Sequence, residues 1–207
     1  ARALVELGAT RLSIGFQSLR PETLELFGRV HGVDDSFAAF EAAKAAGVAA
    51  VSVDLIFGAE GQTVGEWRED LTRVLDLKPE HLSCYGLTFE EGTLFTRWLE
   101  EGRIERIPEE EELELFRATR ELTATRGYHA YEVSNFSLFG HECHHNLNYW
   151  RNGPYVGVGP GAASYVSGTR FGNPRSLEAW RRGAKGGGAS LPWSEELNPA
   201  HRLAETW

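Results

Sequence analysis

Polar side chains follow or interrupt the apolar runs of this chain at two places where they could hold a ligand. At the first, Gln17 ends the run that begins at Arg11, and Arg29 follows a short distance along the chain. An amide together with a guanidinium suits a polar ligand that carries a carboxylate. A purely structural role fits the same residues, with Gln17 capping a loop and Arg29 a solvated surface charge. Spacing alone favours the structural role.

The second place is Asp54, which lies inside the apolar run that ends at Phe57. Burying a lone carboxylate is costly, so this side chain must be paired with another group or must bind something. A ligand contact and a salt bridge to a neighbouring strand account for it equally well.

Three histidines and one cysteine lie between residues 141 and 145 and suggest metal chemistry. Imidazole and thiolate groups bind zinc, haem iron and other metals. Clustered histidines also serve as hydrogen-bonding groups of a loop. A structural zinc site would need a second ligand pair such as Cys-x-x-Cys, which the sequence lacks. Taken alone, the cluster favours the structural role.

The elements that must position these residues repeat one plan, in which an apolar run is followed by a loop and an amphipathic helix. The runs are rich in Val, Ile, Leu and aromatic residues, as strands buried on both faces are, and they cover Arg11–Gln17, Ala50–Phe57 and His81–Leu87. Strand–helix–strand repetition predicts right-handed crossovers and parallel pairing, hence an α/β fold. An open sheet and part of a β/α barrel both remain open. In either, ligand-binding residues gather at the carboxyl ends of the strands.

Helices are predicted from their apolar spacing and their end signals. Trp67, Leu71, Val74 and Leu75 form one stripe at i, i+4, i+7 and i+8. A second helix carries Phe37, Phe40 and Ala43 and ends at Gly47, and a third begins behind Pro108 with Glu109 to Glu112 and ends at Gly127. The chain opens on the last turns of a helix that Gly8 caps, and Pro199 suits the first turn of another. We therefore expect both ends to be truncated.

The composition changes after Gly127 and predicts a boundary there. Residues 1–127 form the α/β part, and residues 128–207, rich in Gly, Asn, His and aromatic side chains, form an α+β accessory region. Short strands are predicted at Ala130–Ser134 and at Ser164–Phe171, the latter turning at Ser167–Gly168. The Gly183–Ser190 stretch is predicted to be a linker or surface loop.

Bulk composition excludes several classes of protein. The 207 residues, 42% of them hydrophobic and 25% charged, are typical of a globular protein, and no apolar run of about 18 residues could span a bilayer. A net charge of −9 disfavours a nucleic-acid partner. Only two cysteines and no signal segment argue against a secreted, disulfide-bonded fold, so a cytoplasmic location is expected.

Several ordered strings resemble the latter half of the radical S-adenosylmethionine (SAM) domain in oxygen-independent coproporphyrinogen III oxidases and their relatives. They are SIGFQSL, GRVH, DLIFG with GQT, and LSCYGLTFEEGT. The resemblance implies a partial β/α barrel with SAM lying across the strand ends. It further implies SAM contacts by Gln17, Arg29 and Asp54, with Thr88 at a further strand end.

The segment His145–Trp150, HNLNYW, is similar to the HNxxYW signature of the HemW-type branch of this family. That resemblance implies haem binding, with His145 as the candidate ligand of the haem iron and with Tyr149 and Trp150 as flat apolar surface against the porphyrin. The string YVGVGPGAASY is similar to the same branch. The family also holds a [4Fe–4S] cluster on three closely spaced cysteines, which are absent from this chain. Cys84 is predicted to pack as a small apolar residue.

The resemblance implies a haem chaperone that binds SAM and, in the intact protein, a [4Fe–4S] cluster, and that delivers haem to haem proteins. Transient contact with membrane proteins and a homodimer are left open. One alternative is an enzyme, the oxygen-independent coproporphyrinogen III oxidase, in which SAM carries out radical decarboxylation; no catalytic residue is identified for it. A third reading is an α/β protein that binds a metal through the histidine loop and has no SAM site.

Overall fold

The computed structural model of the protein describes residues 1–184 and 192–198. The chain forms two compact units, Ala1–Glu142 and Cys143–Trp207. Within the described ranges, no helix is long and apolar enough to cross a membrane.

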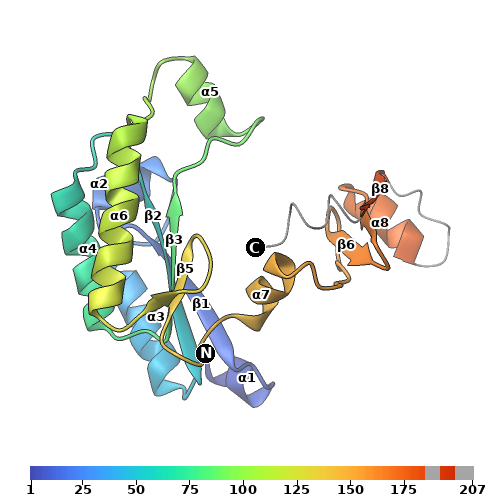
Figure 1. Ribbon diagram of the computed structural model, residues 1–207, viewed down its shortest axis with the longest axis horizontal. Coiled ribbons are helices and arrows are strands. Elements are labelled where there is room, and N and C mark those ends of the chain that lie inside the picture. The colour runs from blue at the N-terminus through green and yellow to red at the C-terminus, as the bar shows by residue number, and fades with distance from the viewer. Residues whose placement is uncertain (185–191, 199–207) are drawn as a thin grey trace. The chain divides into compact units, whose positions relative to one another are not determined.

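A five-stranded sheet with the strand order β1-β2-β3-β5-β4 forms the centre of the first unit (Figure 1). Its parallel strands β1 (Arg11–Gln17), β2 (Ala50–Phe57) and β3 (His81–Gly86) confirm the predicted runs and their pairing. Two short antiparallel strands, β4 (His129–Ala130) and β5 (Asn135–Ser137), extend the β3 edge. The fold is therefore α/β, and the described strands form an open sheet.

The β4–β5 hairpin corrects two sequence predictions. Of the strand expected over Ala130–Ser134, only Ala130 lies in a strand, β4. Residues 131–134 form bends, and β5 begins directly after them. Because β5 pairs with β3 and buries Phe136 in the core, the hairpin belongs to the α/β part. The first unit consequently extends to Glu142, rather than ending at Gly127.

Helices α3, α4 and α6 pack against one face of this sheet (Figure 1). The helices of the first unit are α1 (Arg2–Glu6), α2 (Pro21–Leu26), α3 (Val33–Ala45), α4 (Val64–Asp76), α5 (Leu94–Glu100) and α6 (Glu109–Thr125). Gly8 and Gly47 adopt positive φ angles of 93° and 79° directly after α1 and α3, which confirms the predicted helix ends.

The predicted apolar stripe of α4 faces the core, where Trp67, Leu71, Val74 and Leu75 are all buried. The indole N–H of Trp67 donates to Thr119 Oγ1 on α6 at 2.8 Å and satisfies a buried polar group. A capping box between Thr63 and Glu66 begins α4. The apolar periodicity therefore predicts which face of α4 is buried, and the capping box marks where the helix begins.

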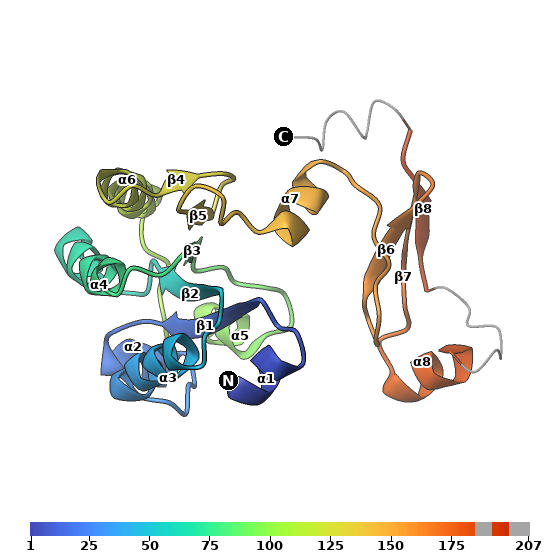
Figure 2. The same ribbon diagram turned by 90° about the horizontal axis from the view of Figure 1, so that it is seen from below.

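The second unit contains a small antiparallel sheet, β6-β7-β8, whose strands lie side by side in Figure 2. Its elements are α7 (His144–Trp150), β6 (Ala163–Val166), β7 (Thr169–Gly172), α8 (Leu177–Ala184) and β8 (Ser194–Glu196). Ser167 and Gly168 form the predicted hairpin turn with φ angles of 52° and 85°. Gly183 and Ala184 of the predicted linker belong to α8, while its remaining residues and the helix expected from Pro199 lie outside the described residues.

Candidate functional site

The central sheet has an apolar face and a polar face. Along β2, Val51, Val53 and Leu55 point toward the helices and are fully buried. Side chains alternate between the faces of a strand, so Asp54 projects from the opposite face. The β1–β2–β3 pairing places Gly15, Asp54 and Ser83 in one row across that face. Asp54 and the residues that flank it in this row therefore share the side of the sheet that faces away from the helices.

Asp54 is partnered by the side chain of Ser13 on β1. The Ser13 hydroxyl oxygen lies 2.8 Å from each carboxylate oxygen of Asp54. Ser13 is exposed and Asp54 is half-buried, so the pair is open to solvent on the polar face. The alternative of a salt bridge to a neighbouring strand is not what the structure shows, because the partner is a neutral hydroxyl. A carboxylate held in this way retains acceptor capacity for a ligand's hydroxyl or amino group.

Gln17 reaches the same region because β1 bulges at its end. The ladder to β2 shifts between Gly15 and Gln17, and Gln17 has a φ of 66°. A Cβ atom added at Gly15 would lie 2.4 Å from Gln17 Nε2, so the amide folds back over the space that the glycine leaves open. The missing side chain of Gly15 thereby brings the Gln17 amide and Asp54 to adjoining positions.

The other two predicted SAM contacts lie in loops. Arg29 follows α2 and is exposed, and its backbone N–H donates to the Leu24 carbonyl oxygen at 2.9 Å. Thr88 lies in the segment after β3 and is also exposed. The geometry therefore gathers Ser13, Asp54 and Gln17 on the sheet but leaves Arg29 and Thr88 on flanking connections.

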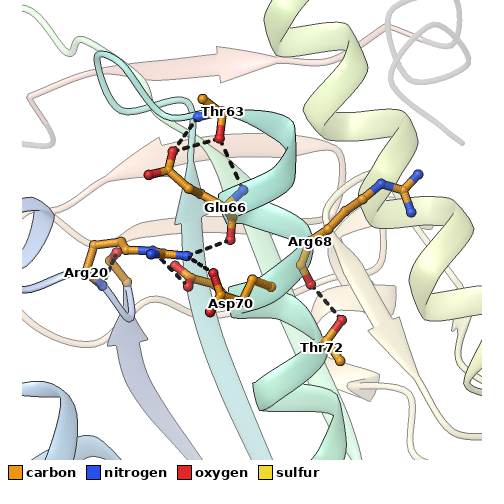
Figure 3. Close-up of polar contacts among 8 residues, drawn as sticks. Arg20, Thr63, Glu66, Arg68, Asp70 and Thr72 are labelled. Atoms are coloured by element: carbon orange, nitrogen blue, oxygen red, sulfur yellow. Dashed lines mark hydrogen bonds and ion pairs between the residues drawn. The ribbon is translucent and has the colours of Figure 1, made fainter.

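The β1–α2 connection is anchored to α4 through Arg20 (Figure 3). Arg20 Nη2 lies 2.7 Å from Glu69 Oε2, and Nε lies 3.0 Å from Asp70 Oδ1. Burial raises the pKa of the Asp70 carboxyl, and the Arg20 guanidinium partly opposes the rise. The same guanidinium donates to the Glu66 carbonyl oxygen at 3.3 Å. These contacts hold the chain immediately after Gln17.

A buried histidine lies further along the polar face. His81 Nδ1 is 2.7 Å from Ser52 Oγ, and Nε2 is 2.6 Å from the Tyr131 hydroxyl. Burial, aided by the positive charge of Arg11, lowers the pKa of His81 to about 4. The ring is therefore neutral near pH 7, and it connects β2, β3 and the β4–β5 turn.

In the second unit, α7 carries the HNLNYW segment beside an aromatic pocket. The His145 and Tyr149 rings lie edge to face at 4.8 Å between centroids, and Tyr149 meets Tyr155 at 4.5 Å. His145 is exposed. A pocket of about 310 Å³, here called the aromatic pocket, is lined by Tyr149, Trp150, Asn152, Tyr155, Tyr165 and Arg170. The three predicted haem contacts thus lie on one helix that borders the aromatic pocket.

The polar and glycine residues around α7 shape the turn that follows it. Asn148 Nδ2 donates to the Pro154 carbonyl oxygen at 3.1 Å. A Cβ atom at Gly153 would lie 2.0 Å from Asn148 Oδ1. Tyr155 and Tyr165 then pair through two backbone hydrogen bonds of 2.9 Å, which brings the loop against β6.

The histidine cluster does not form a multi-ligand metal site. Nowhere in residues 1–184 and 192–198 do three His, Cys, Asp or Glu side chains gather around a position that could hold a metal ion. Glu142 pairs instead with His129 Nε2 at 2.8 Å. An axial ligand to haem iron is a single side chain, so this finding bears on a zinc-type site and leaves the role of His145 a prediction.

The two cysteines do not fit an iron–sulfur cluster. Cys84 is buried on β3, and burial, reinforced by the charge of Asp54, raises the pKa of its thiol, so it packs as the small apolar residue that was predicted. Cys143 lies in the other unit and is half-buried. A [4Fe–4S] cluster held by three cysteines has no place among these residues.

Sequence reasoning did not assign roles to several residues that the structure places at these sites. Ser13 belongs to the SIGFQS string, and its alternation with Gly15 and Gln17 was the available signal. Tyr155 and Tyr165 belong to a string that resembles the HemW type, but only the fold shows that they meet. Arg170 carried no local signal.

Comparison with known proteins finds relatives of this chain. A model of the radical SAM superfamily matches residues 1–74. The chain is 38% identical to "Heme chaperone HemW" of Synechocystis over 97% of its length and 49% of the relative, and 40% identical to "Heme chaperone HemW" of Bacillus subtilis over 82% and 45%. The chain therefore spans about half the length of these curated relatives.

The fold has a solved counterpart. The structure of coproporphyrinogen III oxidase (HemN) from Escherichia coli, a radical SAM enzyme, superposes with a TM-score of 0.78 over 98% of this chain and 49% of that one. The sequence identity of 21% shows a common fold and nothing finer. The family assignment follows from the HemW relatives. The chain belongs to the radical SAM proteins of the HemW type.

Proposed function

We propose that the intact protein is a haem chaperone that holds haem against α7, with His145 as a ligand of the haem iron. The observation that carries the proposal is the exposed His145 ring set edge to face with Tyr149 at the border of the aromatic pocket. Tyr149 and Trp150 supply flat apolar surface for the macrocycle. The relatives named haem chaperones support the same assignment.

We further propose that SAM binds at the carboxyl ends of β1, β2 and β3. Asp54, half-buried and held by Ser13, and the Gln17 amide fit a ligand rich in hydroxyl and amino groups. Arg29 and Thr88 complete the contacts from the flanking connections, where their exposure leaves them able to turn toward a ligand. SAM supplies radical chemistry in this superfamily when a cluster is present. In this proposal the cluster ligands lie outside the present sequence.

Haem-accepting proteins are the partners that this function requires. A second copy of the chain and membrane-bound haem proteins are further partners that the proposal includes.

Titration of the intact protein with haemin tests the chaperone proposal. His145→Ala should weaken haemin binding by at least about tenfold and change the Soret band, because the iron loses a ligand. His144→Ala is a matched control, since His144 is the preceding exposed histidine of the same helix. Unchanged affinity and spectrum in His145→Ala would remove His145 as the ligand.

Calorimetry with SAM tests the second proposal. Asp54→Asn and Gln17→Ala should each weaken SAM binding by roughly tenfold, because each removes a polar contact worth about 1–2 kcal/mol. Glu25→Gln, an exposed change on α2, should leave binding as it is. Normal binding in both site variants would refute the assignment.

The alternative activity is the oxygen-independent oxidation of coproporphyrinogen III. The likeness to HemN is one of fold and does not itself favour this reaction. Anaerobic incubation of the reconstituted protein with coproporphyrinogen III and SAM decides between the two. Sustained formation of protoporphyrinogen would replace the chaperone proposal with the enzyme.

A further inference from the structure

Four aromatic rings and a single charged side chain line the aromatic pocket. The rings are those of Tyr149, Trp150, Tyr155 and Tyr165, and the charge is that of Arg170. The volume of the aromatic pocket, about 310 Å³, lies at the lower end of the range for small-molecule pockets. The pocket therefore suits one edge of a large flat ligand. A ligand that fits this lining has an apolar plane and at least one anionic substituent.

Arg170 is positioned by the strand ladder of the second unit. It pairs with Tyr165 on β6 and with Glu195 on β8, so the three residues form one row across the sheet. The row places Arg170 between a tyrosine that lines the pocket and a glutamate. Because it projects from a paired strand, the position of its base is fixed before any ligand arrives.

The ion pair between Arg170 and Glu195 is weak enough to be exchanged. Arg170 Nη1 lies 3.9 Å from Glu195 Oε2, and the Glu195 side chain is 53% exposed. An ion pair at that distance in contact with water contributes little to stability. A ligand carboxylate could bind the guanidinium through two parallel hydrogen bonds, which form a stronger contact. Glu195 would then turn back into solvent at small cost.

We propose that Arg170 binds a free carboxylate of a porphyrin, a propionate side chain, at the edge of the aromatic pocket. The proposal rests on the haem-binding function argued above and adds the residue that recognises the anionic edge of the ligand. It divides recognition into two parts, with His145 acting at the metal and Arg170 acting at the periphery. Esterified porphyrins should therefore bind less tightly than those with free propionates.

Paired titrations of the intact protein with haemin and with haemin dimethyl ester test this proposal. The two ligands share the macrocycle and iron and differ in the charge of the propionates. The unmodified protein should bind haemin about tenfold more tightly than the ester, because one charge-assisted contact is lost. Arg170→Gln should weaken haemin binding by the same factor and leave the ester unchanged, so retained ester binding also shows that the hairpin is folded.

Two further variants provide matched comparisons. Arg151→Gln removes an exposed arginine that directly follows α7 and is not among the pocket-lining residues, and it should not alter the preference for haemin. Glu195→Gln removes the competing carboxylate and should tighten haemin binding by about twofold to threefold. Loss of the preference in Arg151→Gln as large as in Arg170→Gln would show a general charge effect and overturn the proposal.

The outcomes separate this inference from the function on which it rests. If haemin binding depends on His145 but Arg170→Gln binds haemin as the unmodified protein does, only the propionate contact is refuted. If Arg170→Gln weakens haemin and ester equally, Arg170 supports the pocket without recognising a carboxylate, and the proposal is again overturned. If the unmodified protein binds neither ligand, both proposals fall.

Discussion

Replacing Arg20 by glutamine should destabilise the first unit at neutral pH, because it leaves Asp70 buried without its ion-pair partner. Asp70 is 1% exposed, and its carboxylate lies 3.0 Å from Arg20 Nε. Burial already raises the pKa of Asp70, and Arg20 restrains that rise. Glu69, the other carboxylate that Arg20 contacts, is exposed and returns to water without loss.

The expected magnitude follows from the burial of the pair. Removing one partner of a buried ion pair costs about 3–5 kcal/mol. Two features reduce that figure here: a quarter of the Arg20 side chain is exposed, and Asp70 is able to take up a proton instead of remaining charged. We therefore expect the free energy of unfolding to fall by about 2–3 kcal/mol at pH 7.

The pH dependence of this loss has a definite sign. Without Arg20 the folded-state pKa of Asp70 rises further, so the folded variant holds a proton that the unfolded chain releases just above pH 4. The contribution of Asp70 to the stability of the variant is then greatest at low pH and is lost as the pH rises through the folded-state pKa. The difference between Arg20→Gln and the unmodified chain should accordingly shrink as the pH is lowered toward about 4.

Thiol labelling provides the assay, because Cys84 is buried in the first unit at 2% exposure. In a Cys143→Ser background, a thiol reagent reaches Cys84 only when the first unit opens, so a brief labelling pulse across a urea series reports that unit alone. The unmodified chain and Arg20→Gln are compared at pH 7 and pH 5.

Two variants control the interpretation. Arg68→Gln, on α4 like Asp70, breaks an exposed ion pair with Glu121 on α6 and should change stability by at most about 0.5 kcal/mol. Adding Asp70→Asn to Arg20→Gln should recover much of the lost stability, since no charge is then buried. A loss below about 1 kcal/mol at pH 7, or one that does not change between pH 7 and pH 5, would refute the reasoning.

Three further predictions use the same chain. Because the pKa of His81 falls from 6.5 to about 4 on folding, stability should drop by about 2 kcal/mol between pH 7 and pH 5, and His81→Gln should flatten that drop in urea titrations. Thr119→Val leaves the buried Trp67 indole N–H without its acceptor and should lower the free energy of unfolding by about 1–3 kcal/mol, whereas Thr125→Val at an exposed position should not. Gly15→Ala should displace the flexible Gln17 amide and weaken SAM binding by about tenfold in calorimetry, with little change in the thermal midpoint of unfolding. Unaltered SAM binding would show that the Gln17 amide does not contact SAM.

The sequence predicts those parts of the fold whose signals are local. The parallel strands are short apolar runs, α4 has a complete stripe with a capping box, and Ser167–Gly168 is a turn pair that adopts the positive φ angles it favours. The β4–β5 hairpin has no such signal. β5 is three residues long, and it is stabilised by pairing with β3 and by burial of Phe136, both of which depend on distant sequence. The boundary after Glu142 follows from that long-range pairing.

The candidate sites divide in the same way. Asp54 attracts attention from sequence because a carboxylate interrupts an apolar run, but its partner Ser13 is fixed by the β1–β2 register. α7 is equally hard to foresee, since Cys143 at its start makes no side-chain capping bond. The aromatic pocket joins α7 to β6 and β7, so Arg170 becomes visible only when the hairpin is folded.

The HNLNYW segment therefore combines two kinds of residue that a motif comparison cannot distinguish. Asn148 shapes the turn after α7 through Pro154, and Gly153 is required there because any side chain would collide with Asn148. Without that turn Tyr149 would not meet Tyr155, and the aromatic pocket would lose one wall. Substitutions at these positions should disturb ligand binding by unfolding the pocket, with esterified and free porphyrins affected alike. Only substitution of a residue that contacts a propionate should affect free and esterified porphyrins differently. The informative measurement is therefore the preference for the free porphyrin over its ester, rather than loss of binding.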